Sequence, residues 1–311
     1  MYKQKLTGVA VASLGMMALL CAPPQTHAAE ASGTVYYGTL NNGAPNLGPR
    51  FGSIVNNELN EIGHTNADEN GRYRGMFFNT QDEQMYAVIR DLDGSGGPEL
   101  HTIDVATGQS TNAINLDLGP VPGGLSYNPT TNQFWYITRA HVGSRIAVDL
   151  YNLEHGFDEA QIPNDLGSCC DSYSLTGIAL DPSSDILYGA GMIKPDGDGD
   201  AVSSLVTIDK STGLIDTTVA TLDMPQVHAM TFRGNKILAI ANAAGNTQPD
   251  SLPTGGNELW EISLDGSATQ LNADLGQFVD AIEFVVPEPA SLALLGLGLI
   301  GLANRRRQTP A

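Results

Sequence analysis

Two acidic loops contain residues whose type and spacing suit a metal ion. In both loops, alternate positions carry side-chain oxygens. These positions are Asp91, Asp93 and Ser95 with the later Glu99 in the first loop, and Asp196, Asp198 and Asp200 in the second. Calcium prefers several such oxygen ligands, and clustered carboxylates repel one another unless a cation neutralises them. The loops therefore predict Ca2+ binding, and the alternative interpretation is two solvated acidic loops.

The first loop resembles the first half of an EF-hand calcium loop, because Gly96 follows the alternating oxygens and permits a sharp turn. The closing glutamate of that pattern is missing, since the twelfth position is Thr102, inside an expected strand. In the second loop Ala201 stands where the glycine is expected. These departures leave both interpretations of the loops open.

A second group of polar residues precedes a repeated five-residue segment. The residues immediately before its copies are Arg74, Gly123, Thr176, His228 and Asp280, and Arg72 lies two residues before the first of them. Arginine, histidine and aspartate together bind anions or perform acid–base chemistry. No nucleophile elbow, zinc-ligand spacing or phosphate loop accompanies them, so we expect a binding face built on Arg72, Arg74, His228 and Asp280 and no catalytic residues.

Cys169 and Cys170 are adjacent in the sequence. Neighbouring Cα atoms lie about 3.8 Å apart, below the usual 4.4–6.8 Å of a disulfide, so a bond between the two sulfurs is strained. Free thiols rarely persist in an oxidising exterior. A vicinal disulfide, an intermolecular disulfide and unpaired thiols all remain open.

The repeated segment indicates the elements that position these residues. Its copies, GMFFN, GLSYNP, GIALDP, AMTFRG and AIEFV, begin at Gly75, Gly124, Gly177, Ala229 and Ala281, which are 49, 53, 52 and 52 residues apart. Each of the first four precedes a turn, an apolar strand, a loop and two further strands. Four short strands repeated every fifty residues or so are typical of β-propeller blades.

Counting the copies predicts an all-β, five-bladed propeller with a three-plus-one closure. Three strands at the start, TVYYGTL, RFGSIVN and LNEIG, lack an inner strand, while AIEFV at the end is an inner strand without followers. We therefore expect the last strand to close the ring against the first ones. In periodicity alone, the body resembles the WD40 and YVTN propellers.

Composition excludes several classes of protein. The chain has 311 residues, 15 Lys and Arg against 34 Asp and Glu, and a formal net charge of -19. Such a charge repels nucleic acid, and the 41% of hydrophobic residues is too high for a disordered acidic chain.

The first 29 residues read as a secretory signal peptide. Lys3 and Lys5 precede an apolar run from Val9 to Leu20, and small residues follow. This order predicts cleavage after Ala28 or Ala29 and leaves a body over residues 30–286.

The last 25 residues, 287–311, combine three features: Pro287, Glu288 and Pro289, an apolar stretch from Ala290 to Ala303, and the cluster Arg305, Arg306 and Arg307. Fourteen helical residues span about 21 Å, so a single transmembrane helix here is short. The arginines predict a cytoplasmic end, as in an ordinary membrane anchor.

This tail resembles the PEP-CTERM sorting signal of exopolysaccharide-producing bacteria. The resemblance implies recognition of Pro287–Pro289 by the transpeptidase exosortase, passage through the inner membrane, and delivery to the cell surface or extracellular matrix. We expect an exported protein that binds glycan, such as exopolysaccharide, or a surface protein on its loop-rich face. The alternative is a calcium-dependent or glycan-active hydrolase.

Overall fold

Every element in the described part of the chain is a β-strand. The computed structural model describes residues 33–39, 48–67, 71–91, 98–115, 122–131, 133–140, 145–152, 173–193, 202–211, 215–242 and 257–286. All of them lie in one unit, Ser32–Ala311. These residues include no helix of the length and apolarity that a membrane crossing needs. The expected signal peptide and the tail from Pro287 lie outside the described residues.

The described strands form five antiparallel sheets, each made almost entirely of strands that follow one another in the sequence. From the inner strand outward, the sheets are β19 (Val279–Val285), β1 (Thr34–Thr39), β2 (Arg50–Val55) and β3 (Glu58–His64); β4 (Gly71–Asn79), β5 (Gln84–Asp91), β6 (Glu99–Ile103) and β7 (Ser110–Asn115); β8 (Pro122–Asn128), β9 (Gln133–Ala140) and β10 (Arg145–Asn152); β11 (Tyr173–Asp181), β12 (Ile186–Ile193), β13 (Val202–Ile208) and β14 (Ile215–Thr221); and β15 (Val227–Arg233), β16 (Lys236–Asn242), β17 (Asn257–Ser263) and β18 (Ala268–Asn272).

Short polar side chains fix the turns that separate these strands. Asn79, Asn128 and Asp181 end three inner strands, and each accepts a hydrogen bond from the backbone N–H two residues later. The turns after β13 and β17 use Asp209 and Asp265 in the same way. Such Asx turns compete with strand pairing and reverse the chain locally. The repeated turn residues therefore determine where each strand ends.

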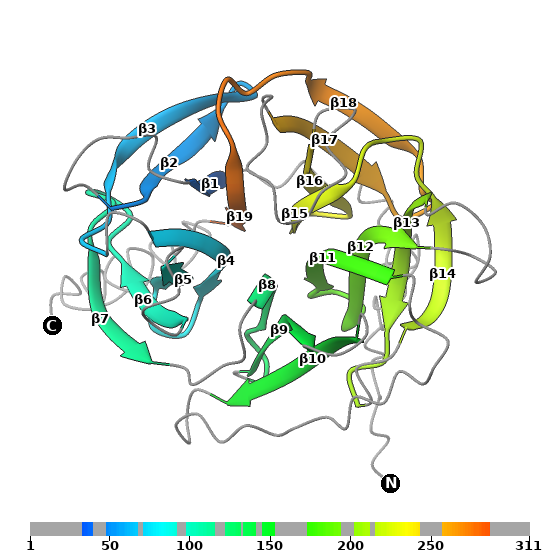
Figure 1. The fold of residues 1–311 in the computed structure, drawn as a ribbon, viewed down its shortest axis with the longest axis horizontal. Helices are drawn as coiled ribbons and strands as arrows, with labels where there is room; N and C mark the ends of the chain where they lie inside the picture. Colours follow the sequence, from blue (N-terminus) through cyan, green and yellow to red (C-terminus); the bar gives the residue numbers. More distant parts are fainter. Residues whose placement is uncertain are drawn as a thin grey trace, which may run out of the picture. The chain divides into compact units, whose positions relative to one another are not determined.

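The inner strands form a closed ring, visible at the centre of Figure 1. β4 contacts β8, β8 contacts β11, β11 contacts β15, β15 contacts β19, and β19 contacts β4. The last strand, β19, pairs with β1 from Thr34 opposite Val285 to Thr39 opposite Val279. This pairing confirms the expected closure, in which the end of the body supplies the inner strand that the opening strands lack. The body is a β-propeller.

The expectation of five complete blades needs correction. Four of the sheets have four strands, and the sheet β10–β9–β8 has three among the described residues. The fourth strand expected for that blade falls in residues 153–172, which lie outside the described part. The structure therefore has four complete four-stranded blades rather than five.

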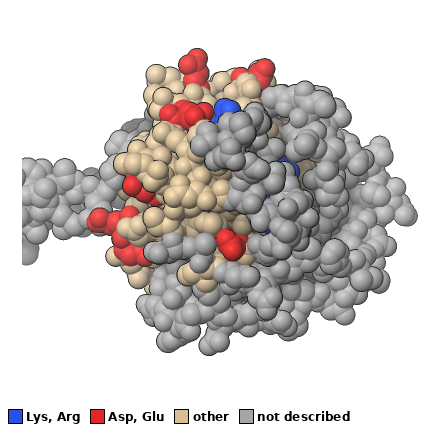
Figure 2. Space-filling model, turned by 60° about the vertical axis from the view of Figure 1, so that its left-hand side comes forward, with Lys and Arg blue, Asp and Glu red and all other residues tan. Residues whose placement is uncertain are grey.

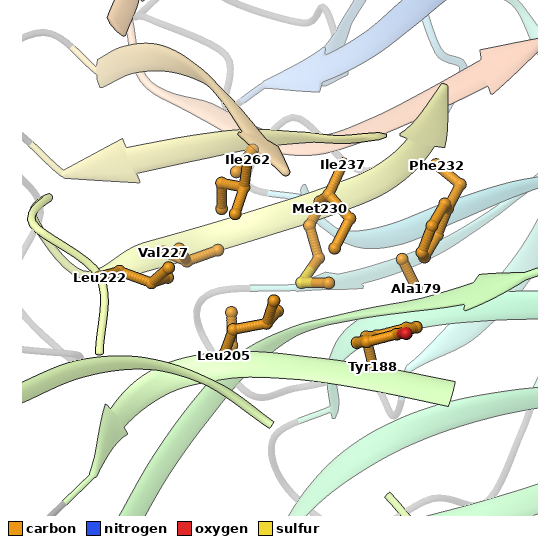
Figure 3. Packing of buried hydrophobic residues seen from close by; sticks show 11 residues of the cluster. Ala179, Tyr188, Leu205, Leu222, Val227, Met230, Phe232, Ile237 and Ile262 are labelled. Carbon is orange, nitrogen blue, oxygen red and sulfur yellow. The ribbon is translucent and has the colours of Figure 1, made fainter. Parts of the chain in front are cut away.

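Apolar side chains fill the interfaces between neighbouring sheets. Figure 3 shows the cluster in which Val227 and Met230 of β15 lie against Leu205 of β13 and Tyr188 of β12. In another interface the buried Phe77 stacks on Tyr86, Tyr127 and Phe134, with ring centroids 4.9–5.3 Å apart. Close packing of this kind leaves little freedom for the inner strands. The ring is therefore a rigid support for side chains at its two ends.

Candidate functional site

Each of the five inner strands contains a β-bulge near its beginning. In four strands the unpaired residue is the one that the sequence placed before the repeated segment: Arg74, Thr176, His228 and Asp280. In β8 the unpaired residue is Gly124, with φ of 61°, and Gly123 pairs with Ile137. Bulges bend a strand and redirect its side chains. They bring the same part of every inner strand to one end of the ring, which we call the bulge end.

Arg72 of β4 and Asp280 of β19 form an ion pair at the bulge end. The Arg72 Nε donates to Asp280 Oδ1 over 2.6 Å, although the two residues are 208 positions apart. Arg72 is 7% exposed and Asp280 is 3% exposed. Charge-assisted hydrogen bonds between buried partners are strong only while both partners are present. This pair ties the closing strand to the first complete blade.

His228 of β15 and Phe278 complete the cluster. The His228 Nε2 lies 3.6 Å from Asp280 Oδ1, and its ring lies 4.9 Å from the ring of Phe278. The Arg72 guanidinium lies 4.6 Å from the centre of the Phe278 ring, a cation–π distance. We name Arg72, His228, Phe278 and Asp280 the bulge-end cluster. It joins three inner strands that are distant in the sequence.

The charge state of His228 follows from its surroundings. Burial lowers the pKa of His228, and Arg72 and Arg74 add to this lowering, while Asp280 opposes it. The imidazole is therefore neutral at pH 7 and offers one donor and one acceptor. Its side chain is 20% exposed, so solvent and a ligand both have access to it.

Asp280 has one buried oxygen still available for a hydrogen bond. Its Oδ1 accepts from Arg72, whereas Oδ2 is buried and has no hydrogen-bond partner in the described part of the chain. A buried carboxylate oxygen without a donor is costly. The cluster thus combines a neutral imidazole, a partly exposed aromatic ring and an acceptor oxygen. This combination suits recognition of a polar ligand.

Sequence reasoning identified most of this cluster. Arg72, His228 and Asp280 were expected on one face, and the structure brings them together. Arg74 acts on His228 through its charge. Phe278 was not identified individually, although the blade-to-blade loop that contains it was assigned to the same face. An aromatic residue directly before an inner strand was the available signal.

Most of the expected metal ligands lie outside the described residues. Asp91 ends β5, whereas Asp93, Ser95, Asp196, Asp198 and Asp200 are not described. Glu99 begins β6, and its carboxylate lies 3.3 Å from His101 Nε2. The described residues contain no group of three or more potential metal ligands. Calcium binding stays a prediction.

The remaining sequence-based assignments also fall outside the described part of the chain. They concern the cleavage residues Ala28 and Ala29, the thiols of Cys169 and Cys170, and the sorting residues Pro287, Glu288, Pro289 and Arg305–Arg307. Within the described surface, Figure 2 shows carboxylates widely spread with few basic side chains between them. This surface agrees with the net charge of -19.

Sequence reasoning missed a carboxylate at the other end of the ring. Glu283 of β19 occupies the position held by Phe77, Ser126, Ala179 and Thr231 in the other inner strands. It lines a cavity of about 210 Å³ together with residues from all five inner strands. A charged residue type at an otherwise uncharged repeat position was the signal that could have revealed it.

The C-terminal part of the chain matches a known sorting signal. Residues 285–307 match the family model described as the PEP-CTERM protein-sorting motif. This motif indicates export, passage associated with the membrane, and processing by an exosortase. No curated protein matches the sequence.

Solved structures resemble the body of the chain. A chain in the crystal structure of a nidogen/laminin complex is 10% identical with a TM-score of 0.50, over 81% of this chain and 98% of that chain. TolB from Acinetobacter baumannii is 14% identical with a TM-score of 0.48, over 84% of this chain and 68% of that one. A protein of unknown function from Bacteroides caccae is 13% identical with a TM-score of 0.46, over 83% and 85%. At such identities the likeness concerns the fold alone.

Proposed function

Because this chain carries a PEP-CTERM sorting motif behind a propeller body, we propose that it is an exported binding protein of the cell surface or extracellular matrix. Its ligand, in this proposal, is a glycan or a partner protein that docks on the bulge end of the ring. The observation that carries the proposal is the bulge-end cluster, in which His228 and Phe278 stay partly exposed beside a buried Arg72–Asp280 pair.

The chemistry of the cluster favours a glycan. Sugars present hydroxyl groups beside apolar ring faces, and a neutral imidazole next to an aromatic ring matches both features. The acidic surface supports a neutral glycan over a polyanionic one, since like charges repel. Calcium in the loops Asp91–Glu99 and Lys194–Asp200 would reduce this repulsion, and those loops remain part of the proposal.

Binding to extracellular polysaccharide from the producing cells tests this function. We expect His228→Gln and Phe278→Ala each to weaken binding about tenfold or more, equivalent to about 1.4 kcal/mol, because each removes a direct contact. His64→Gln is the matched control, since His64 lies on the outer strand β3. Equal affinity for the wild type and both bulge-end variants would contradict the assignment.

A glycan-active hydrolase is the second candidate, favoured by the His228 Nε2 lying 3.6 Å from a carboxylate. Release of reducing ends from the same polysaccharide distinguishes the two. Turnover that is lost in His228→Gln while binding persists would support the hydrolase. Binding without turnover supports the binding protein, which we prefer because Asp280 is already committed to Arg72.

The export route predicts the ends of the mature protein. Mass spectrometry of the protein recovered outside the cell should find a chain that begins after Ala28 or Ala29. It should also lack Arg305–Arg307, because exosortase is expected to cut near Pro287–Pro289 on its N-terminal side of the arginines. A mature chain that still ends in these arginines would instead indicate a permanent membrane anchor.

A further inference from the structure

The cavity beside Glu283 lies at the opposite end of the inner strands from the bulge-end cluster. Its lining comes from late residues of all five inner strands and from the turns that follow three of them, at Thr80, Pro129 and Pro182. Glu283 follows Asp280 by three residues, about 10 Å along an extended strand. The cavity is therefore a separate feature of the ring and was not used in assigning the ligand face above.

Aromatic side chains surround most of this cavity. The same register position of the inner strands carries Phe78, Tyr127, Leu180, Phe232 and Phe284, and all five line the cavity. Four of these five are aromatic, and they come from four different blades. Aromatic faces attract cations, and several faces around one space form the cage that quaternary ammonium groups prefer.

Glu283 is the one carboxylate among the described residues that line the cavity, and no described lysine, arginine or histidine lines it. Its Oε1 accepts from the Phe78 N–H over 3.3 Å, and its Oε2 accepts from Thr231 Oγ1 over 3.1 Å. A carboxylate has about four acceptor sites. Glu283 therefore keeps capacity for a further donor, and its negative charge lacks a protein cation among the described residues of the wall.

The protonation of Glu283 supports this view. Burial raises the pKa of Glu283 to about 8, against the two hydrogen bonds, which favour the charged form. No charged side chain contributes to this shift. The carboxyl is mostly protonated at pH 7, and a bound cation would ionise it by supplying the missing positive charge.

We propose that this cavity binds a small organic ammonium ion, with its charge against the Glu283 carboxylate and its apolar groups against the aromatic wall. The volume equals about seven water molecules at roughly 30 Å³ each, which accommodates a small amine and excludes a polymer. Binding releases the Glu283 proton to solvent while the ammonium ion forms the ion pair. Affinity therefore rises with pH up to the range in which Glu283 is already ionised.

Calorimetric titration of the exported protein with choline and with 3,3-dimethylbutan-1-ol tests the proposal, because the alcohol is an uncharged isostere of choline. We expect choline to bind at least about tenfold more tightly than the alcohol. Titrations at pH 7 in buffers of different ionisation enthalpy should show release of about one proton. Affinity for choline should increase from pH 6 to pH 8.

Two variants isolate the groups responsible. Glu283→Gln keeps the size of the side chain and should lose choline binding about tenfold or more, together with the proton release. Phe284→Leu keeps the carboxyl and should weaken choline more than the alcohol. Glu83→Gln, at an exposed turn residue outside the cavity lining, is the matched control and should bind like the wild type.

Three results would overturn the proposal: no choline binding at millimolar concentration, equal affinity for the alcohol, or unchanged affinity in Glu283→Gln. Thermal unfolding of each variant verifies that it is folded, and Phe284→Leu provides the test if Glu283→Gln is not. His228→Gln should leave choline binding unchanged, so failure at this cavity and failure of the proposed ligand face are distinguishable.

Discussion

Truncation of the chain after Leu275 is expected to abolish the cooperative unfolding transition, whereas truncation after Val286 should preserve it. The shorter chain loses β19, whose pairing with β1 closes the ring. It also loses Val279, Ala281 and Ile282, which are 0–2% exposed in the core. Burial of one valine or isoleucine stabilises by about 1.5–3 kcal/mol, and a whole domain has only about 5–15 kcal/mol.

Urea unfolding followed by the fluorescence of Trp135 and Trp260 measures this effect. Both tryptophans lie outside the deleted strand, so they report on the remaining blades. A synthetic peptide of residues 276–286 should restore the transition of the shorter chain if the strand acts by pairing. An unchanged urea midpoint after truncation at Leu275 would show that the ring does not depend on its closing strand.

Asp280→Asn should destabilise the folded protein by about 3–5 kcal/mol, because it leaves the charge of Arg72 buried without its partner. The side chain of Asp280 is fully buried and that of Arg72 is 9% exposed, so water cannot replace the lost interaction. Chemical denaturation of the variant and the wild type gives the difference in free energy of unfolding.

Asp274→Asn is the matched control for this change. Asp274 lies in the same loop, is exposed, and uses Oδ1 to accept from the Gly276 N–H, which the amide oxygen of asparagine also accepts. We expect a change within about 0.5 kcal/mol. The double variant Arg72→Met, Asp280→Leu should recover part of the lost stability, since it removes both buried charges. A loss equal to the sum of the single variants would refute the coupling.

The candidate site was foreseeable in part because each blade is local in the sequence. Arg74, His228 and Asp280 were identifiable as residues preceding repeated strands, and their bulges confirm that position. Glu283 and the aromatic positions around it were not, since an alternating strand does not reveal which face meets a cavity. A bulge shifts that alternation by one residue, and β8 shows that its place varies between blades.

From the sequence alone came the repeat period, the closing strand and the sorting motif, because these depend on contacts or signals within about fifty residues of chain or less. Only the tertiary structure decided that Arg72, His228 and Asp280 meet, that Phe278 lies between them, and that Glu283 lies in an aromatic cavity at the opposite end. These contacts join different blades, up to 208 residues apart. They exist because ring closure and the bulges place distant inner strands side by side, and no local pattern encodes that geometry.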